Sequence, residues 1–86
     1  MYSVSYRKAA LKALRRMPAP QARKMREALS EIARDPYRAR GSQWKPMKGG
    51  DFWRLGQGGY RAVCRIDDGA VVILVLKVGP RGDVYK

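Results

Sequence analysis

The spacing of the apolar positions changes twice along the chain, and each change predicts a different element. The first apolar side chains alternate with serines, which is the two-residue period of a short strand: Tyr2, Val4 and Tyr6. From residue 8 they recur every three or four residues, as on one face of a helix: Ala10, Leu14 and Met17. The same spacing returns after a Pro-Ala-Pro segment: Met25, Leu29 and Ile32. Because proline suits the first turn of a helix, we expect a helical hairpin whose apolar stripes belong to the core.

After Gly41 the pattern becomes strand-like again, with turn residues between the segments. WKPM (44–47) contains a proline, so it is expected to be at most an edge strand or an extended loop. DFWRLG (51–56) and GYRAVCRI (59–66) are predicted strands, and AVVILVLKV (70–78) is typical of a central strand covered on both faces. The predicted fold is α+β: an N-terminal strand, a two-helix hairpin and a three-stranded antiparallel meander, with the helices on one face.

The position of each turn decides which strand residues share a face of the sheet. With a two-residue loop at residues 57–58, Arg54 lies opposite Arg61. With a turn at residues 67–69, Arg61 lies opposite Val75. One face then collects basic side chains: Arg54, Arg61, Arg65, Lys77 and Arg81. The other collects the apolar side chains that the helices need to bury: Trp53, Leu55, Tyr60, Ala62, Cys64, Ile66, Leu74, Leu76 and Val78.

The charge of the chain gives this basic face a meaning. The 86 residues, expected to form a single domain over 1–86, carry 19 Lys and Arg against 7 Asp and Glu, a net charge of +12. Like charges on neighbouring strands repel one another unless an anion lies between them, and a merely solvated face would mix both signs. We therefore expect a phosphate-binding face, and a nucleic acid fits it better than an acidic protein or an anionic membrane. A tolerated basic surface is the alternative.

Several chemistries are disfavoured by what the chain lacks. Cys64 is the single cysteine and there is no histidine, so an internal disulfide and the common zinc and catalytic-triad sites are not expected. Neither a metal nor a cofactor is expected. The N-terminal segment has no apolar signal region, and the longest apolar run (70–76) is too short to cross a bilayer. We expect a soluble protein in the reducing cytoplasm, with no membrane partner and with Cys64 buried as a small hydrophobe.

The order and spacing of five segments resemble the RelE/ParE superfamily of bacterial and archaeal toxins. These segments span nearly the whole chain: YSVSYRKAALKAL (2–14), DPYRARG (35–41), WKPMKGGDFWRL (44–55), GGYRAVCRIDD (58–68) and VLKVGPRGDVYK (75–86). The resemblance implies a microbial-RNase-like fold and a cognate antitoxin. For the RelE branch it implies a metal-independent endonuclease that cuts mRNA in the ribosomal A site. Such enzymes use the RNA's own 2′-hydroxyl as nucleophile and leave a 2′,3′-cyclic phosphate and a 5′-hydroxyl.

The same resemblance assigns roles to individual residues. It implies a catalytic set in which three arginines clamp the scissile phosphate while a tyrosine stacks on a base or exchanges a proton: Arg54, Arg61, Arg81 and Tyr85. RNA-binding roles are expected for four further basic residues: Lys45, Lys48, Arg65 and Lys77. Related toxins often carry a basic residue two positions after the one that matches Arg54, whereas this chain has Gly56.

Other interpretations of these residues stay open. Arginine keeps its proton and is a poor general base, so the candidate bases are Lys45, Lys48 and Lys77. Tyr85 would equally serve to cap the sheet edge, and Arg54 to pair with a carboxylate such as Asp51. Both tryptophans are expected to be packing residues. Of the two, Trp44 is the better candidate for contact with RNA.

Two other functions fit the same sequence. One is that of the ParE branch, a non-enzymatic inhibitor of DNA gyrase, which the missing histidine and Gly56 leave open. The other is a basic RNA-binding module without chemistry. The presence of Arg61, Arg81 and Tyr85 favours the endonuclease.

Overall fold

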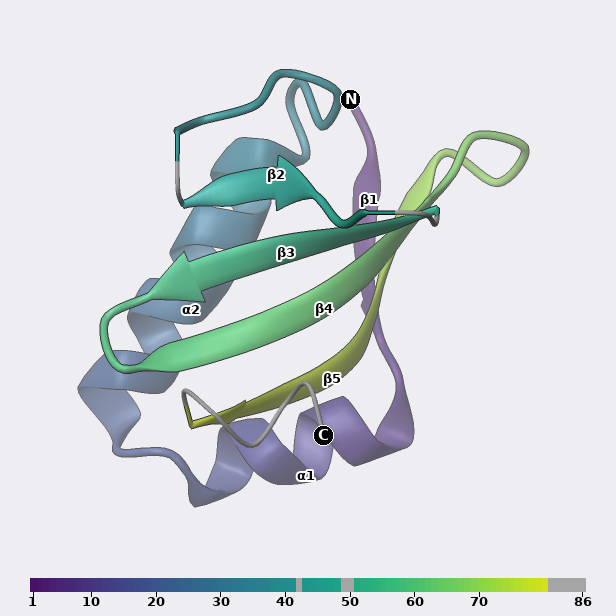
Figure 1. Cartoon of the computed structure of the whole chain (residues 1–86). Helices are drawn as coiled ribbons and strands as arrows, with labels where there is room; N and C mark the ends of the chain where they lie inside the picture. The colour runs from purple at the N-terminus through teal and green to yellow at the C-terminus, as the bar shows by residue number, and fades with distance from the viewer. Residues whose placement is uncertain (42, 49–50, 81–86) are drawn as a thin grey trace.

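A five-stranded sheet, covered on one face by two helices, forms the frame of the chain (Figure 1). The structure is a computed structural model and describes residues 1–41, 43–48 and 51–80. The elements follow in the order β1 (Ser3–Tyr6), α1 (Lys8–Arg16), α2 (Ala19–Ile32), β2 (Trp44–Pro46), β3 (Phe52–Gln57), β4 (Tyr60–Asp67) and β5 (Val72–Pro80). The strand order is β1-β5-β4-β3-β2, with β1 parallel to β5 and the other neighbours antiparallel. The predicted α+β fold is confirmed.

Both helical stripes are buried against the sheet as the spacing predicts. All six residues are core residues: Ala10, Leu14 and Met17 from the first stripe, and Met25, Leu29 and Ile32 from the second. α1 packs mainly on β5, and α2 packs on β1 and β3. Pro18 is the residue directly before α2 and Pro20 lies in the first turn of the helix, where a missing backbone N–H leaves no hydrogen bond unmade.

The register of the β3–β4 hairpin differs from the sequence-based prediction by two residues. The turn is at Gly58 and Gly59, so Arg54 lies opposite Val63, and Arg61 lies opposite Gly56 rather than Arg54. The left-handed φ of 62° at Gly58 is accessible to glycine at little cost. Because side chains alternate with a period of two, a two-residue slip keeps every side chain on its predicted face.

The β4–β5 register was predicted less well, and the error changes which residues form the core. The turn spans residues 68–71, so Ile66 lies opposite Ile73 and not opposite Ala70. The register is shifted by an odd number of residues, which exchanges the two faces of the strand near the turn. Ile73 and Val75 therefore lie in the core. Leu74 and Leu76 were wrongly assigned to the core and are only partly buried.

A β-bulge in the same hairpin corrects the register further along. Cys64 pairs with Val75 and Val63 with Lys77, so Leu76 is an extra residue on β5. Beyond the bulge the side chains of β5 lie on their predicted faces again, and Lys77 lies on the same face as Arg61 and Arg65, as expected. Arg61, predicted opposite Val75, lies opposite Gly79 instead.

The two tryptophans are packing residues, and Trp44 is fully buried. Its indole Nε1 donates a 2.8 Å hydrogen bond to the carbonyl oxygen of Pro36, and its ring stacks on Trp53 at a centroid distance of 5.1 Å. The expectation that both tryptophans pack is confirmed. Trp44, the better candidate of the two for RNA, has no exposed surface with which to contact it, because β2 pairs with β3 and places that ring in the core. Cys64 is buried as predicted, and burial raises the pKa of its thiol to about 12.

Candidate nucleic-acid interface

Five cations form one surface on the side of the sheet that faces away from the core. This surface, called the basic face below, is defined by Lys45, Arg54, Arg61, Arg65 and Lys77. The pairing of β2 to β5 arranges it in three rows across the strands. The middle row is the most basic, since it consists of Lys45, Arg54, Val63 and Lys77 in consecutive strands. Like charges this close favour an anion between them.

Arg61 occupies a row of its own, with a glycine on each side. Gly56 is its partner on β3 and Gly79 its partner on β5. The Arg61 side chain is partly buried and lies over Gly56: a Cβ built on Gly56 would be 2.6 Å from Arg61 Nη1 and 3.2 Å from its Cζ. The guanidinium therefore occupies the volume that a side chain at position 56 would fill. A Lys or Arg at position 56 would compete for this space.

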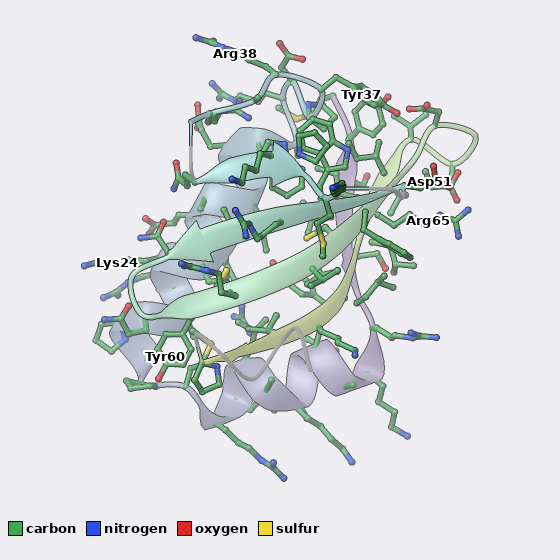
Figure 2. The ribbon with its side chains drawn as sticks, viewed as in Figure 1. Lys24, Tyr37, Arg38, Asp51, Tyr60 and Arg65 are labelled. Atoms are coloured by element: carbon green, nitrogen blue, oxygen red, sulfur yellow. The ribbon has the colours of Figure 1, made fainter. Side chains whose placement is uncertain are left out.

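The third row contains an aromatic side chain that the sequence analysis did not single out. Phe52 lies opposite Arg65, which in turn lies opposite Leu74. Phe52 is 40% exposed. The period of two along β3 was the available signal, since residues 52, 54 and 56 share one face. Figure 2 labels Tyr60 and Arg65 near the two ends of β4, between which the three rows lie.

Carboxylates gather at one end of the sheet and leave the Arg61 end free of strand carboxylates. Among the described strands the only acidic residue is Asp67, the last residue of β4. Asp51 and Asp68 lie at the same end, where they line a cavity of about 290 Å³ together with Arg65. Figure 2 labels Asp51 and Arg65 close to each other at this end. Arg61, six residues back along β4, therefore meets an anion with less competition from carboxylates than Arg65 does.

Asp68 is held at that end by two tyrosines. The hydroxyls of Tyr2 and Tyr37 each donate a 2.7 Å hydrogen bond to its carboxylate. These two bonds hold the pKa of Asp68 below its usual range. The bond to Asp68 raises the pKa of Tyr37 to about 12 and also raises the pKa of Tyr2. This carboxylate is therefore part of a structural contact.

The structure brings most, but not all, of the predicted site residues together. Lys48 lies exposed beyond β2 and outside the three rows. Arg81 and Tyr85 lie outside the described residues. Pro80, at the end of β5, pairs with Tyr60, so the strand ends next to Arg61 in the sheet. Lys45 pairs with Arg54 and therefore lies on the basic face. The sequence alone did not place this lysine on that face.

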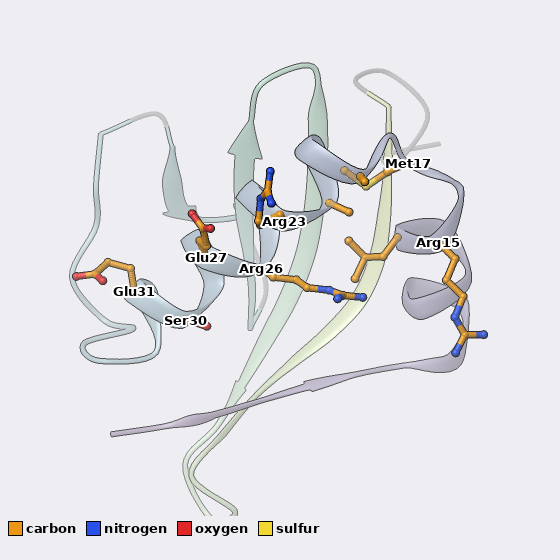
Figure 3. Close-up of a pocket in the computed structure, with 10 residues that line it drawn as sticks. Arg15, Met17, Arg23, Arg26, Glu27, Ser30 and Glu31 are labelled. Carbon is orange, nitrogen blue, oxygen red and sulfur yellow. The ribbon is translucent and has the colours of Figure 1, made fainter.

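A further concavity is a groove between the two helices. It has a volume of about 730 Å³ and lies between α1 and α2 (Figure 3). Its apolar floor includes Leu14 and Met17, and its rim carries both signs of charge, with Arg23, Arg26 and Glu27 among the residues. None of the predicted site residues lines this groove, so the basic face is the better candidate for chemistry on a phosphate.

Two further observations concern the part of the chain that the structure describes. There, no three His, Cys, Asp or Glu residues come together in a way that would hold a metal ion. No helix in the same part is long and apolar enough to cross a membrane.

Comparison with known proteins identifies the class that this fold and this face define. The sequence profile of the family described as ParE toxin of type II toxin-antitoxin system, parDE, matches residues 4–85. The chain therefore belongs to this family of the RelE/ParE superfamily, and it is a type II toxin with a RelE-like structure. No curated protein sequence matches it significantly.

Solved structures of RelE toxins share the fold over nearly the whole chain. The isolated E. coli RelE toxin superposes with a TM-score of 0.80 at 26% identity, covering 99% of this chain and 92% of that one. RelE in the intact E. coli RelBE toxin–antitoxin complex gives 0.77 at 26% identity, covering 93% and 96%. The archaeal RelE–RelB complex from Pyrococcus horikoshii gives 0.76 at 28% identity, covering 96% and 98%. The RelE/ParE resemblance is thereby confirmed.

Proposed function

We propose that this toxin is a ribosome-dependent mRNA endonuclease whose active site is the Arg61 end of the basic face. The observation that carries the proposal is the placement of Arg61 between Gly56 and Gly79, with the cationic row of Lys45, Arg54 and Lys77 beside it. Glycines on both sides leave the guanidinium accessible to a phosphate. The likeness to solved RelE toxins supports the RelE branch, for which the resemblance in sequence implies an RNA substrate.

The proposed reaction is cleavage by the substrate's own 2′-hydroxyl. The 2′-oxygen attacks the adjacent phosphorus, the bond from phosphorus to the 5′-oxygen breaks, and the products are a 2′,3′-cyclic phosphate and a 5′-hydroxyl. One proton leaves the 2′-hydroxyl and one reaches the departing 5′-oxygen, so no water or cofactor is consumed. Arg54, Arg61 and Arg81 stabilise the charge on the pentavalent phosphate, because planar guanidinium groups bind two of its oxygens at once.

The proton transfers need other groups than arginine. Tyr85 is the proposed donor to the leaving oxygen or a stacking partner for a base. Three lysines are the proposed candidates for the general base. Lys45 and Lys77 lie in the middle row of the basic face, and Lys48 lies outside it. With no strong base such as histidine in the chain, we expect naked RNA to be cut slowly, if at all, because the ribosome must position the 2′-hydroxyl.

The proposed partners are the ribosome, its mRNA and a cognate antitoxin. Several solved relatives are complexes with RelB antitoxin, one of them with an antitoxin peptide. A net charge of +12 attracts an acidic or amphipathic antitoxin segment, which would neutralise the toxin by covering the basic face or displacing the residues after Pro80. A complex that leaves Arg61 and Arg81 open and Tyr85 undisturbed would contradict this masking.

Alanine substitution of Arg61 and of Arg81 tests the proposal. Arg61→Ala and Arg81→Ala should each lower mRNA cleavage on purified ribosomes by roughly 10² to 10³, as loss of one preorganised donor does. Ribosome binding should fall much less, because one of many phosphate contacts is lost. Arg61→Lys should recover part of the binding without the full rate, since a point charge does not reproduce the planar fork.

The measurement is primer extension on ribosome-bound mRNA, read together with a DNA supercoiling assay. Circular dichroism and thermal unfolding of each variant control for the fold. Folded Arg61→Ala and Arg81→Ala proteins that stay fully toxic to cells would show that the arginines are not the active site. If the wild-type toxin also left mRNA intact and blocked supercoiling, the gyrase-directed function would replace the endonuclease.

A further inference from the structure

We infer that Gly56 is a positioning residue, whose missing side chain lets the Arg61 guanidinium lie across β3 in a productive orientation. This inference rests on the proposed function of Arg61. The Arg61 guanidinium occupies the space that a side chain at position 56 would enter.

The distances carry the inference. A Cβ on Gly56 would be 2.6 Å from Arg61 Nη1, 3.2 Å from Cζ and 3.7 Å from Nε, so its three nearest contacts would all be with the same guanidinium group. The backbone beneath is fixed, because Gly56 pairs with Arg61 across the hairpin and its N–H donates a 2.8 Å hydrogen bond to the carbonyl oxygen of Gln43. A new Cβ therefore displaces the guanidinium and leaves the strand in place.

The backbone of Gly56 does not require glycine. Its φ is not in the left-handed region, unlike that of Gly58. Glycine inside a strand weakens it, since it loses the most conformational freedom on folding. A structural role would thus favour alanine at this position, and glycine is explained only by the group that lies over it. Thermal stability and activity are expected to move in opposite directions when alanine is introduced.

The test is Gly56→Ala, with Gly59→Ala as the matched control in the same hairpin. A Cβ on Gly59 meets no atom within 4 Å, and its φ is also not positive. Gly56→Ala should unfold at the wild-type temperature or above it while mRNA cleavage on the ribosome falls by on the order of 10², the effect of a small misplacement of a catalytic group. Gly59→Ala should keep the wild-type rate.

A double variant separates positioning of Arg61 from other effects. If Gly56 acts through Arg61, Gly56→Ala combined with Arg61→Ala should cleave no more slowly than Arg61→Ala alone. An equal further loss in the double variant, or wild-type cleavage by Gly56→Ala, would overturn the inference.

A second measurement does not depend on cleavage. The Arg61 Nε–Hε resonance, assigned by its disappearance in Arg61→Ala, should shift in Gly56→Ala and stay in place in Gly59→Ala. An unchanged resonance in Gly56→Ala would refute the inference even if the toxin is an endonuclease. A shifted resonance in a toxin whose Arg61→Ala variant is fully active would instead refute the proposed function, while the contact between Gly56 and Arg61 would stand.

Discussion

Phe52 is the exposed aromatic residue of the basic face, and from its position we expect it to contribute to the proposed binding of RNA. It is 40% exposed and lies opposite Arg65, two residues before Arg54 on the same side of β3. An aromatic ring beside cations is the usual arrangement for stacking a base of single-stranded nucleic acid while its phosphates contact the cations.

We predict that Phe52→Ala weakens binding of a short single-stranded RNA by about 1–3 kcal/mol, the contribution of one stacked base. Fluorescence anisotropy with a labelled RNA measures the change. Phe52→Tyr is the control, because it keeps the ring and should bind as the wild type does. Equal affinity of Phe52→Ala and wild type would show that the RNA does not cross this end of the face.

At the scale of the elements, one contact joins three segments that are far apart in the sequence. Asp68, in the β4–β5 turn, accepts hydrogen bonds from Tyr2 before β1 and from Tyr37 after α2. Tyr37 also packs edge-on against Trp53, with ring centroids 6.1 Å apart. The contact thus ties the N-terminal segment and the loop after α2 to the sheet.

The pKa values of this contact predict a pH dependence of stability. Because the pKa of Asp68 is lowered, its contribution to the free energy of unfolding is present above the unfolded-state pKa of 3.8. That contribution is lost as the pH falls through the pKa that Asp68 has in the folded protein. The raised pKa of Tyr37 means that its contribution is present below pH 10.0 and is lost as pH rises toward about 12. The stabilising contribution is therefore greatest between these limits.

We predict that Tyr37→Phe lowers the melting temperature most between about pH 5 and 9, with the difference from wild type shrinking at both extremes. An NMR titration of the Asp68 carboxyl should show its pKa moving back toward 3.8. Tyr60→Phe, at the other end of β4, is the control and should leave the Asp68 titration unchanged. A difference in melting temperature that is the same at every pH would contradict this account.

At the scale of the whole molecule, the cations that give the net charge of +12 are not all on the basic face. The basic face concentrates cations on one side of the sheet, whereas α1 carries exposed lysines such as Lys8 and Lys12 on the side of the helices. Release of counterions from RNA depends on how many cations contact phosphates, so the two groups are distinguishable by salt.

We predict that Lys45→Ala with Lys77→Ala reduces the slope of log affinity against log salt by about 1.4, since each lost phosphate contact on single-stranded RNA is worth about 0.7. Lys8→Ala with Lys12→Ala removes the same charge from α1 and should change the slope much less. Anisotropy titrations at several salt concentrations give both slopes. Equal reductions would mean that binding depends on overall charge and not on the basic face.

How much of this site the sequence predicts depends on the kind of question. The sequence alone predicted the two buried helical stripes, the burial of Cys64 and the common face of Arg54, Arg61 and Arg65. The helical stripes follow from a period of 3.6 residues, and the shared face of the strand residues follows from a period of two. That face does not change when the register of a strand shifts by an even number of residues. The charge of the face also follows from the sequence, because the strands contain almost no acidic residue.

The partners of each residue across the sheet were decided only by the tertiary structure. In GQGG a turn one residue earlier or later looks equally good locally, and an apolar run such as AVVILVLKV has no period to mark its buried side. The bulge at Leu76, the core positions of Ile73 and Val75, and the place of Arg61 over Gly56 result from packing the whole sheet against both helices. A period in the sequence determines the face of a side chain, but long-range pairing determines its neighbours, and the chemistry proposed for this toxin depends on those neighbours.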